Sequence, residues 1–178
     1  MKRCAWVKDP LEIEYHDHEW SVESHDERYL FEMLVLESAQ AGLSWLTILR
    51  KREAYRTCLH NFDVHKIQHM RVEDIINFDG VIKNKLKASA IIHNAKLIVQ
   101  NKISLNDLMW SYTDGKVLKS LYLTESDLSR QISKDLKKMG FKFVGPTIIY
   151  SYMQAIGMID DHEKDCDLYL MRNSFLYS

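Results

Sequence analysis

The chain has 178 residues, of which 46% are hydrophobic, enough for the core of one domain or two small ones. Its two prolines and six glycines argue against a β-sandwich, a barrel or a low-complexity chain. The formal net charge of −1 gives no overall attraction to nucleic acid or to membranes, so an anionic partner would need a local basic patch. No apolar run reaches membrane-spanning length, and the opening MKRCAWVKDP lacks the apolar stretch of a signal peptide. We therefore expect a cytoplasmic protein with no membrane contact.

Apolar residues recur at helical spacing along most of the chain. Segment 26–42 places Leu30, Leu34 and Ala41 on one stripe, with Asp26 as a plausible N-cap and Gly42 as a stop. The same pattern predicts further helices at 44–62, 72–78, 81–99, 104–112, 127–140 and 145–157, with a long loop at 113–126. The sequence therefore predicts a compact all-α fold, with too many short helices for a simple four-helix bundle.

Segment 145–157 differs from the other predicted helices because it is apolar almost all round. Pro146 lies near its start and Gly157 at its end, which are favoured positions for these residues. A helix without a polar face has no side to expose to water. We therefore expect this helix to be central and buried.

The stretch DHEKDC, residues 161–166, resembles half of a metal site. His162 and Cys166 are four residues apart, and imidazole and thiolate are the ligands that zinc takes most readily. Cys4, with His16 or His18, would complete a closed Cys2His2 site that joins the two ends of the chain. The alternative is two unrelated pairs of surface residues. The third cysteine, Cys58 in AYRTCLHNF, is most simply interpreted as a core thiol. An odd number of cysteines in a cytoplasmic protein predicts no disulfide framework.

A carboxylate occupies an unusual place in the stripe of segment 26–42. Glu37 lies between Leu34 and Ala41 on the face expected to point inward. A buried carboxylate is costly without a partner, so it either pairs with a buried arginine or backbone N–H groups, or it meets a ligand in a pocket. Four large aromatic residues nearby in sequence fit a slot for a flat, electron-poor ring, although most aromatics are core residues: Trp6, Tyr15, Trp20 and Trp45.

Residues 73–98 read as a short helix, a tight turn at Gly80 and a longer helix, which is the form of a helix-hairpin-helix element. Lys83, Lys85 and Lys87 follow the turn, where backbone N–H groups can hold one phosphate and lysines can neutralise others. The alternative is an ordinary solvated helix face. A second basic run could widen the patch: Lys134, Lys137, Lys138 and Lys142.

Together these segments resemble the 3-methyladenine DNA glycosylase I family of bacterial base-excision repair, over roughly residues 3 to 166. The resemblance rests on RCAW, DPLEIEYHDHEW, LFEMLVLESAQAGLSWLTILRKREAYR, GVIKNKLKASAIIHNA, ISKDLKKMGFKFVGPTIIYSYMQAIG and DHEKDC, in the same order. It implies a helix-hairpin-helix glycosylase fold, formed as a single domain over 1–178 with its hairpin element at about 73–98. It also implies a zinc staple between the terminal segments 1–20 and 158–170. One structural zinc per chain would be held by Cys4, His16, His162 and Cys166, so that the resemblance selects His16 over His18.

The resemblance further implies an enzyme that flips a damaged nucleotide out of double-stranded DNA and hydrolyses its N-glycosidic bond. In this interpretation Glu37 accepts hydrogen bonds from the edge of 3-methyladenine and favours its positive charge. Tyr15 and Trp45 stack on the ring, and Trp6 and Trp20 complete the walls. The enzyme is expected to act as a monomer, and without strand cleavage because no lysine stands out as a Schiff-base nucleophile.

The resemblance also suggests which residues touch DNA. Gln40, Gly42 and Leu43, in AQAGLSW, resemble a loop that fills the gap left by the flipped base, although Leu43 could instead be an ordinary helix-end staple. The hairpin would contribute Gly80, Lys83 and Lys85.

The sequence departs from the family at Ser21, Glu23 and Ser38, of which Ser38 follows the pocket carboxylate and could shift the pocket. The tail after Cys166 does not follow the family and is expected to be peripheral. Two other classes of protein are weighed against the glycosylase. A zinc-stapled DNA-binding module without catalysis would need the hairpin but not the carboxylate among aromatics. A zinc hydrolase would need an open coordination position, which four protein ligands do not leave.

Overall fold

The computed structural model describes residues 1–119 and 122–174, with side chains up to residue 172. The described residues form α1 (Pro10–His18), α2 (Glu27–Gln40), α3 (Trp45–Cys58), α4 (Val64–Ile67), α5 (Val72–Ile76), α6 (Lys85–Asn101), α7 (Leu105–Ser111), β1 (Leu118–Lys119), α8 (Asp127–Met139), α9 (Pro146–Ala155), β2 (Ile159–Asp160) and α10 (Asp167–Ser174). The prediction of an all-α fold with many short helices is confirmed. No helix in this part of the chain is both long and apolar enough to cross a membrane.

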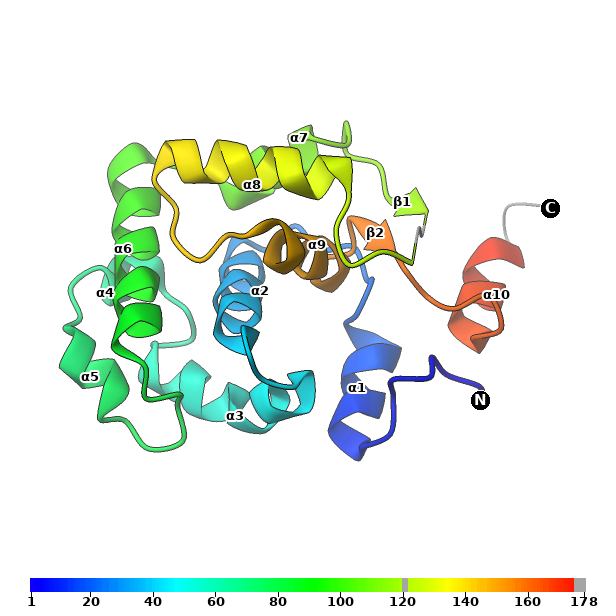
Figure 1. Ribbon diagram of the computed structural model, residues 1–178, viewed down its shortest axis with the longest axis horizontal. Helices are drawn as coiled ribbons and strands as arrows, with labels where there is room; N and C mark the ends of the chain where they lie inside the picture. Colours follow the sequence, from blue (N-terminus) through cyan, green and yellow to red (C-terminus); the bar gives the residue numbers. More distant parts are fainter. Residues whose placement is uncertain (120–121, 175–178) are drawn as a thin grey trace.

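Helices α2 and α9 form the centre of the molecule. In Figure 1 α8 lies above them, α6 beside them, and α3 and α1 below. Every residue of α2 from Leu30 to Ala39 is buried, and α9 packs against α2 and α8. The prediction that segment 145–157 forms a central, buried helix is therefore confirmed, because Ile149, Tyr152 and Met153 have no exposed surface.

Helix α6 begins four residues later than the sequence pattern suggests. The pattern starts at Val81, but the helix starts at Lys85, where the Asn84 side chain caps it by accepting from the Lys87 N–H. The apolar Val81 is buried before the helix begins, which explains why periodicity alone extended it. The preceding turn needs a glycine, since a Cβ on Gly80 would lie 2.7 Å from the Cβ of Ala54 in α3.

Three helices and one strand pair escaped the sequence pattern. Helix α1 is specified by its cap, not by an apolar stripe: Asp9 accepts from the Leu11 N–H, and the Glu12 carboxylate accepts from the Asp9 N–H. Helices α4 and α10 are short. The expected loop 113–126 contains β1, which pairs in parallel with β2 at Leu118↔Ile159, and its residues 120–121 lie outside the described part. A two-residue strand is too short for periodicity to reveal.

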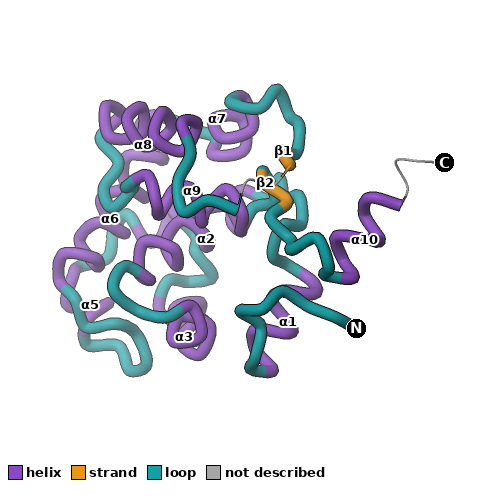
Figure 2. Tube along the Cα trace, turned by 45° about the vertical axis from the view of Figure 1, so that its right-hand side comes forward, coloured by secondary structure: helices purple, strands orange, loops and turns teal. Residues whose placement is uncertain are grey.

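The two ends of the described chain lie together on one side of the molecule (Figure 2). The Ser21 N–H donates to the Gln154 carbonyl at 2.9 Å, and the Asp167 N–H donates to the Lys2 carbonyl at 2.9 Å. Gly157 allows this approach, because a Cβ there would lie 2.3 Å from the backbone of Val22. The junction brings the N-terminal segment against the strand that leads to the DHEKDC motif.

The tail after Cys166 lies at one edge of the molecule (Figure 1), as the sequence predicts, and specific polar contacts join it to the rest of the chain. It forms α10, and the Arg172 guanidinium donates to the Ser21 carbonyl at 2.7 Å and lies 3.8 Å from the Asp160 carboxylate. Asp167 adds a second connection, because its carboxylate accepts from the Lys2 N–H at 2.8 Å.

Candidate active site

A cavity of about 380 Å³ opens between α1, α2, α3 and α9. It brings together the aromatic residues and the carboxylate that the sequence singled out, although they come from separate segments. Its walls are Trp6, Glu12, Tyr15, Trp20, Glu37, Gln40, Trp45, Ser151 and Gln154. A slot of this size and lining suits a flat heterocycle.

Glu37 is buried on the pocket-facing side of α2, with 5% of its surface exposed. Its Oε2 atom has no hydrogen-bond partner within the described residues. Burial raises the pKa of this carboxyl from its usual 4.5 to about 8. The explanation by pairing with a buried arginine is wrong, because Arg52 instead binds Glu32 at 2.6 Å and Glu19 at 2.7 Å. The carboxyl is therefore free to meet a ligand.

Two further polar atoms of the pocket lack partners among the described residues. They are the Tyr15 hydroxyl and the Trp45 Nε1 atom, both buried. The two rings are 5.1 Å apart between centroids and tilted by 52°, so they form adjoining faces of the slot. Unpaired buried polar atoms are uncommon and costly, and a cluster of three around one cavity is expected where a polar ligand binds.

The opposite wall is built from two tryptophans that rest on histidines. Trp6 and Trp20 meet edge to face at 5.2 Å between centroids. Trp20 also lies 5.9 Å from the His16 ring and 4.9 Å from the His162 ring. Tyr15 and His16 are neighbours in α1, but Tyr15 lines the slot whereas His16 packs behind the tryptophan wall.

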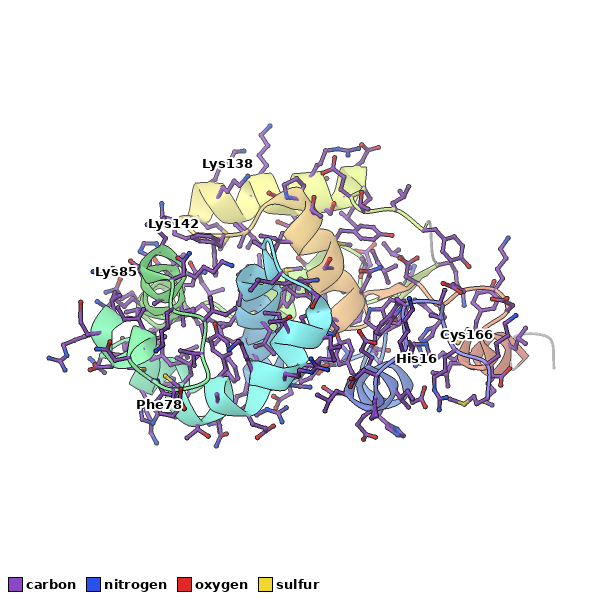
Figure 3. The ribbon with its side chains drawn as sticks, turned by 60° about the horizontal axis from the view of Figure 1, so that its bottom comes forward. His16, Phe78, Lys85, Lys138, Lys142 and Cys166 are labelled. Atoms are coloured by element: carbon purple, nitrogen blue, oxygen red, sulfur yellow. The ribbon has the colours of Figure 1, made fainter. Side chains whose placement is uncertain are left out.

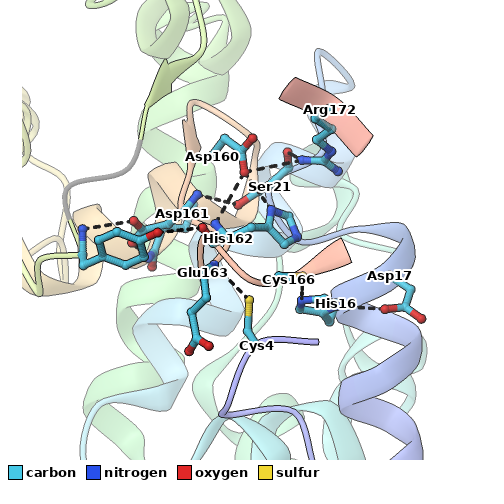
Figure 4. A network of polar contacts seen from close by, with 12 residues as sticks. Cys4, His16, Asp17, Ser21, Asp160, Asp161, His162, Glu163, Cys166 and Arg172 are labelled. Carbon is cyan, nitrogen blue, oxygen red and sulfur yellow. Dashed lines mark hydrogen bonds and ion pairs between the residues drawn. The ribbon is translucent and has the colours of Figure 1, made fainter. Parts of the chain in front are cut away.

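Behind this wall lies a buried cluster that could hold a metal ion (Figure 4). One ligand atom each from Cys4, His16 and Cys166 lie within 4.8 Å of one another, and Cys166 Sγ is 3.6 Å from His16 Nε2. The His162 ring adjoins them, 5.0 Å from that of His16, and its buried Nε2 atom has no partner among the described residues. Burial above all raises the pKa of the Cys4 thiol to about 12, a cost that a bound cation would offset.

Carboxylates orient both histidines of this cluster. His16 Nδ1 lies 2.8 Å from the Asp17 carboxylate, and His162 Nδ1 lies 2.7 Å from that of Asp160. The Nε2 atom of His16 faces Cys166 Sγ, and that of His162 has no partner among the described residues. Such carboxylate–histidine pairs are the usual outer shell of a metal site, so the donor set fits a metal ion.

The rim of the slot is formed where α2 ends. A neighbouring cavity of about 220 Å³ is lined by Glu37, Gln40, Ala41, Gly42, Leu43, Thr147, Ile148 and Ser151. Gln40 therefore faces both cavities, and Leu43 is 41% exposed. Gln40, Gly42 and Leu43, which the sequence analysis assigned to a gap-filling loop, thus lie at the mouth of the slot, beside the beginning of α9.

Two of the departures from the family pattern have structural explanations. Ser38 does not face the slot: its hydroxyl lies 2.7 Å from the Leu34 carbonyl and 2.9 Å from the Phe143 carbonyl, so it ties α2 to the α8–α9 loop. The expectation that it shifts the pocket is not supported by this geometry. Ser21 has φ 58°, a left-handed conformation in which a glycine would be less strained.

The predicted DNA-contacting residues on the hairpin have different surroundings. Lys83 and Lys85 are exposed, whereas Gly80 is held against α3 and its carbonyl accepts from Lys51 at 3.0 Å. Figure 3 shows Lys85, Lys142 and Lys138 on one side of the molecule, with His16 and Cys166 on the other. The second basic run borders a groove of about 480 Å³ lined by Arg130, Ser133, Lys134, Lys137, Lys138 and Pro146.

Three pocket residues were missed in the sequence: Glu12, Ser151 and Gln154. Ser151 and Gln154 are three apart in the otherwise apolar α9, so they share a face, and this polar pair was the available signal. The Gln154 amide is held by Asp161, 2.5 Å from its Nε2. Glu12 offered no signal beyond its part in the helix cap.

Comparison with known proteins gives consistent matches over almost the whole chain. The family model for methyladenine glycosylase matches residues 6–169. DNA-3-methyladenine glycosylase 1 of Escherichia coli (strain K12) is 46% identical over 182 aligned residues, covering 95% of this chain and 97% of that protein. A crystal structure of 3-methyladenine DNA glycosylase I has a TM-score of 0.88 at 47% identity, covering 93% and 98%. A structure of the Staphylococcus aureus enzyme, which addresses its recognition of 3-methyladenine, has a TM-score of 0.86 at 40% identity, covering 93% and 95%.

The described helices enclose an aromatic slot around a buried carboxylate, a kind of site into which a flat heterocycle fits. The chain belongs to the methyladenine glycosylase family.

Proposed function

We propose that this chain is a monofunctional DNA glycosylase that removes 3-methyladenine from alkylated double-stranded DNA. The observation that carries the proposal is the set of unpartnered polar atoms on Glu37, Tyr15 and Trp45 inside one aromatic slot. Membership of the methyladenine glycosylase family and the similarity to proteins named 3-methyladenine DNA glycosylase support it. We expect the chain to act as a monomer and as one domain, since residues of α1, α2, α3 and α9 line the slot together.

The chemistry is a hydrolysis in which the damaged base is the leaving group. Methylation at N3 places a positive charge on adenine, so the bond between N9 and the sugar breaks more easily than in normal adenine. The electron pair of that bond passes to the base, which leaves as the neutral molecule, and water adds to the sugar carbon and loses one proton to the solvent. The task left to the protein is to select and hold the cationic base.

Glu37 performs the selection in this proposal. Its carboxylate would accept from the exocyclic amine of adenine and attract the ring charge, which offsets the cost of ionising a carboxyl whose pKa is about 8. Tyr15 and Trp45 would stack on the cationic ring, with Trp6 and Trp20 closing the other side. A guanine would present a carbonyl oxygen to Glu37 in place of the amine, and that mismatch disfavours it.

The rim and the basic residues would hold the DNA. Gln40, Gly42 and Leu43 lie at the mouth of the slot, where they could fill the space left by an extruded base. Lys83 and Lys85 after the turn at Gly80 would neutralise backbone phosphates. The α8–α9 loop could add to this surface: the backbone N–H groups of residues 143 and 145 have no acceptor within the described chain, and Lys142 is adjacent.

We further propose that the buried cluster holds one structural zinc ion through Cys4, His16, His162 and Cys166. The unpartnered Nε2 of His162 and the two carboxylate–histidine pairs support this set. Four protein ligands would leave no open position for water, so the ion would join the terminal segments and take no part in the reaction.

The test is base release from methylated duplex DNA, with products separated by chromatography. We expect free 3-methyladenine to appear while 7-methylguanine remains in the DNA. Binding of duplex DNA without any released base would contradict the glycosylase and leave a zinc-stapled DNA-binding module. Release of both bases at similar rates would contradict the role of Glu37 in selection.

A further inference from the structure

One lysine of the basic segment after Gly80 turns inward. Lys87, in the first turn of α6, extends its side chain to the C-terminal end of α2. Its ammonium donates to the Ala39 carbonyl at 2.8 Å and to the Ala41 carbonyl at 2.9 Å. Gln40, which lines the slot, lies between these two residues. Lys87 therefore grips the backbone on both sides of Gln40.

The end of α2 needs such a partner. The last carbonyls of a helix have no intrahelical donor, and α2 carries no basic residue in its last turn. At Ala41 the chain turns away with φ −47° and ψ 113°. Lys87 forms no ion pair with a carboxylate in the described part of the chain, so its charge is directed at these carbonyls.

The segment that Lys87 holds is the rim of the slot. The Leu43 N–H donates to the Gln40 carbonyl at 2.6 Å, which closes a tight turn through Gly42 at φ 81°. Leu43 projects outward from this turn and Gln40 faces the cavity. A shift of the Ala39 and Ala41 carbonyls would therefore move both side chains.

We propose that Lys87 is a positioning residue for DNA repair by this chain, whose ammonium fixes the Gln40–Leu43 turn at the mouth of the base pocket. The effect of Lys87 on activity rests on the proposed function, because the turn would matter when a base is extruded from a duplex. Lys87 lies two residues after the exposed Lys85, but the proposal gives it a role other than contact with DNA phosphates.

The test compares Lys87→Met, which keeps the side-chain stem, with Lys87→Arg and with Lys96→Met. Lys96 is an exposed lysine on the same helix and serves as the matched control. Hydrogen exchange measured by mass spectrometry should show faster exchange in the peptide covering residues 39–46 for Lys87→Met alone. This readout does not depend on activity. Unchanged exchange in that peptide would overturn the proposal.

Activity measurements then separate positioning from loss of the pocket. In Lys87→Met we expect single-turnover release of 3-methyladenine from duplex DNA to fall about tenfold or more, with affinity for the free base changed less than about twofold. Lys87→Arg should restore most of the rate, and Lys96→Met should match the wild type. Equal loss of free-base affinity would mean that the substitution damages the pocket and would contradict the proposal.

Binding of unmodified duplex at several salt concentrations provides the remaining control. The salt dependence should be unchanged in Lys87→Met, because its ammonium is occupied by carbonyls. A decrease of about one in the slope would show a phosphate contact and overturn the inference. If the wild type releases no base but exchange still increases in Lys87→Met, the proposed function fails while the positioning of the turn holds.

Discussion

At the scale of single residues, the central feature is a carboxyl group that no other described residue neutralises. Glu37 is buried, its Oε2 is unpartnered, and burial alone raises its pKa to about 8. Near neutral pH the empty pocket therefore favours the protonated form. Under the proposed function, uptake of a cationic base would favour the ionised form of Glu37 and release a proton, and this coupling would favour a positively charged ligand.

This raised pKa predicts a pH dependence of stability. A carboxyl whose pKa rises on folding, from 4.5 to about 8, contributes stability that is full below 4.5 and is lost as the pH rises through 8. Glu37→Gln removes this titration. We measure the free energy of unfolding of both proteins with urea across this range. The difference, variant minus wild type, should therefore rise as the pH increases from 4.5 to about 8 and stay constant at higher pH. Parallel curves for the two proteins would contradict the burial of an ionisable Glu37.

At the scale of elements, a buried charge network fixes the helices that carry the slot. The Arg52 guanidinium of α3 binds Glu32 of α2 at 2.6 Å, and it binds Glu19, at the end of α1, through two bonds of 2.8 Å and 2.7 Å. Arg56 adds a second contact to Glu32 at 2.8 Å. Because Tyr15, Glu37 and Trp45 lie on α1, α2 and α3, this network sets their relative positions.

Removing the central arginine should therefore be costly. Arg52→Met leaves the carboxylate of Glu19 without its guanidinium partner and leaves buried Glu32 with Arg56 alone of its two arginines, and we expect the free energy of unfolding to fall by about 3 kcal/mol. Arg50→Met is the matched control, since Arg50 is 61% exposed and forms its ion pair with Asp9 at 3.0 Å, and it should cost less than about 1 kcal/mol. Urea denaturation of both variants provides the comparison. Equal small losses would show that the network does not organise the three helices.

The same elements show how far the sequence could lead. Apolar periodicity predicted α2, α8 and α9, and it exposed Glu37 as a carboxylate on an inward stripe. It missed α1, whose start is set by a capping box and not by an apolar stripe. It also missed the β1–β2 pair, which depends on contact between segments far apart in the sequence. Spacing within one segment could not reveal that Gln154, more than a hundred residues from Glu37 in the sequence, lines the same cavity. Nor could it show that Lys87 turns inward while Lys85 does not.

At the scale of the whole molecule, the terminal segments meet in one junction behind the slot. Cys4 and His16 come from the N-terminal segment, and His162 and Cys166 from the C-terminal one. The two histidine rings in turn support Trp20, at 5.9 Å and 4.9 Å. The junction therefore stabilises the fold and one wall of the pocket together.

If the cluster holds zinc as proposed, loss of the ion should affect both the stability of the fold and the wall of the pocket. Removal of zinc by a chelator, or Cys166→Ser, should lower the Tm and change the tryptophan fluorescence, because the histidines that back the pocket wall lose their common partner. Cys58→Ser is the control, since that cysteine lies in the core away from the cluster. Metal content, Tm and fluorescence are measured on the same samples. Stoichiometric zinc retained in Cys166→Ser would refute the proposed ligands.

The central claim, that Glu37 selects a cationic adenine, is tested most directly by single-turnover release of 3-methyladenine from methylated duplex DNA. The comparison is between the wild type, Glu37→Gln and Glu12→Gln. Glu12 lines the same cavity, but its carboxylate already accepts from the backbone N–H groups of Lys8 and Asp9. We expect Glu37→Gln to lose roughly 10- to 100-fold in rate, as for the loss of a charged hydrogen bond, while Glu12→Gln stays within about threefold of the wild type. A Glu37→Gln enzyme with wild-type rate and selectivity would contradict the assignment of the pocket.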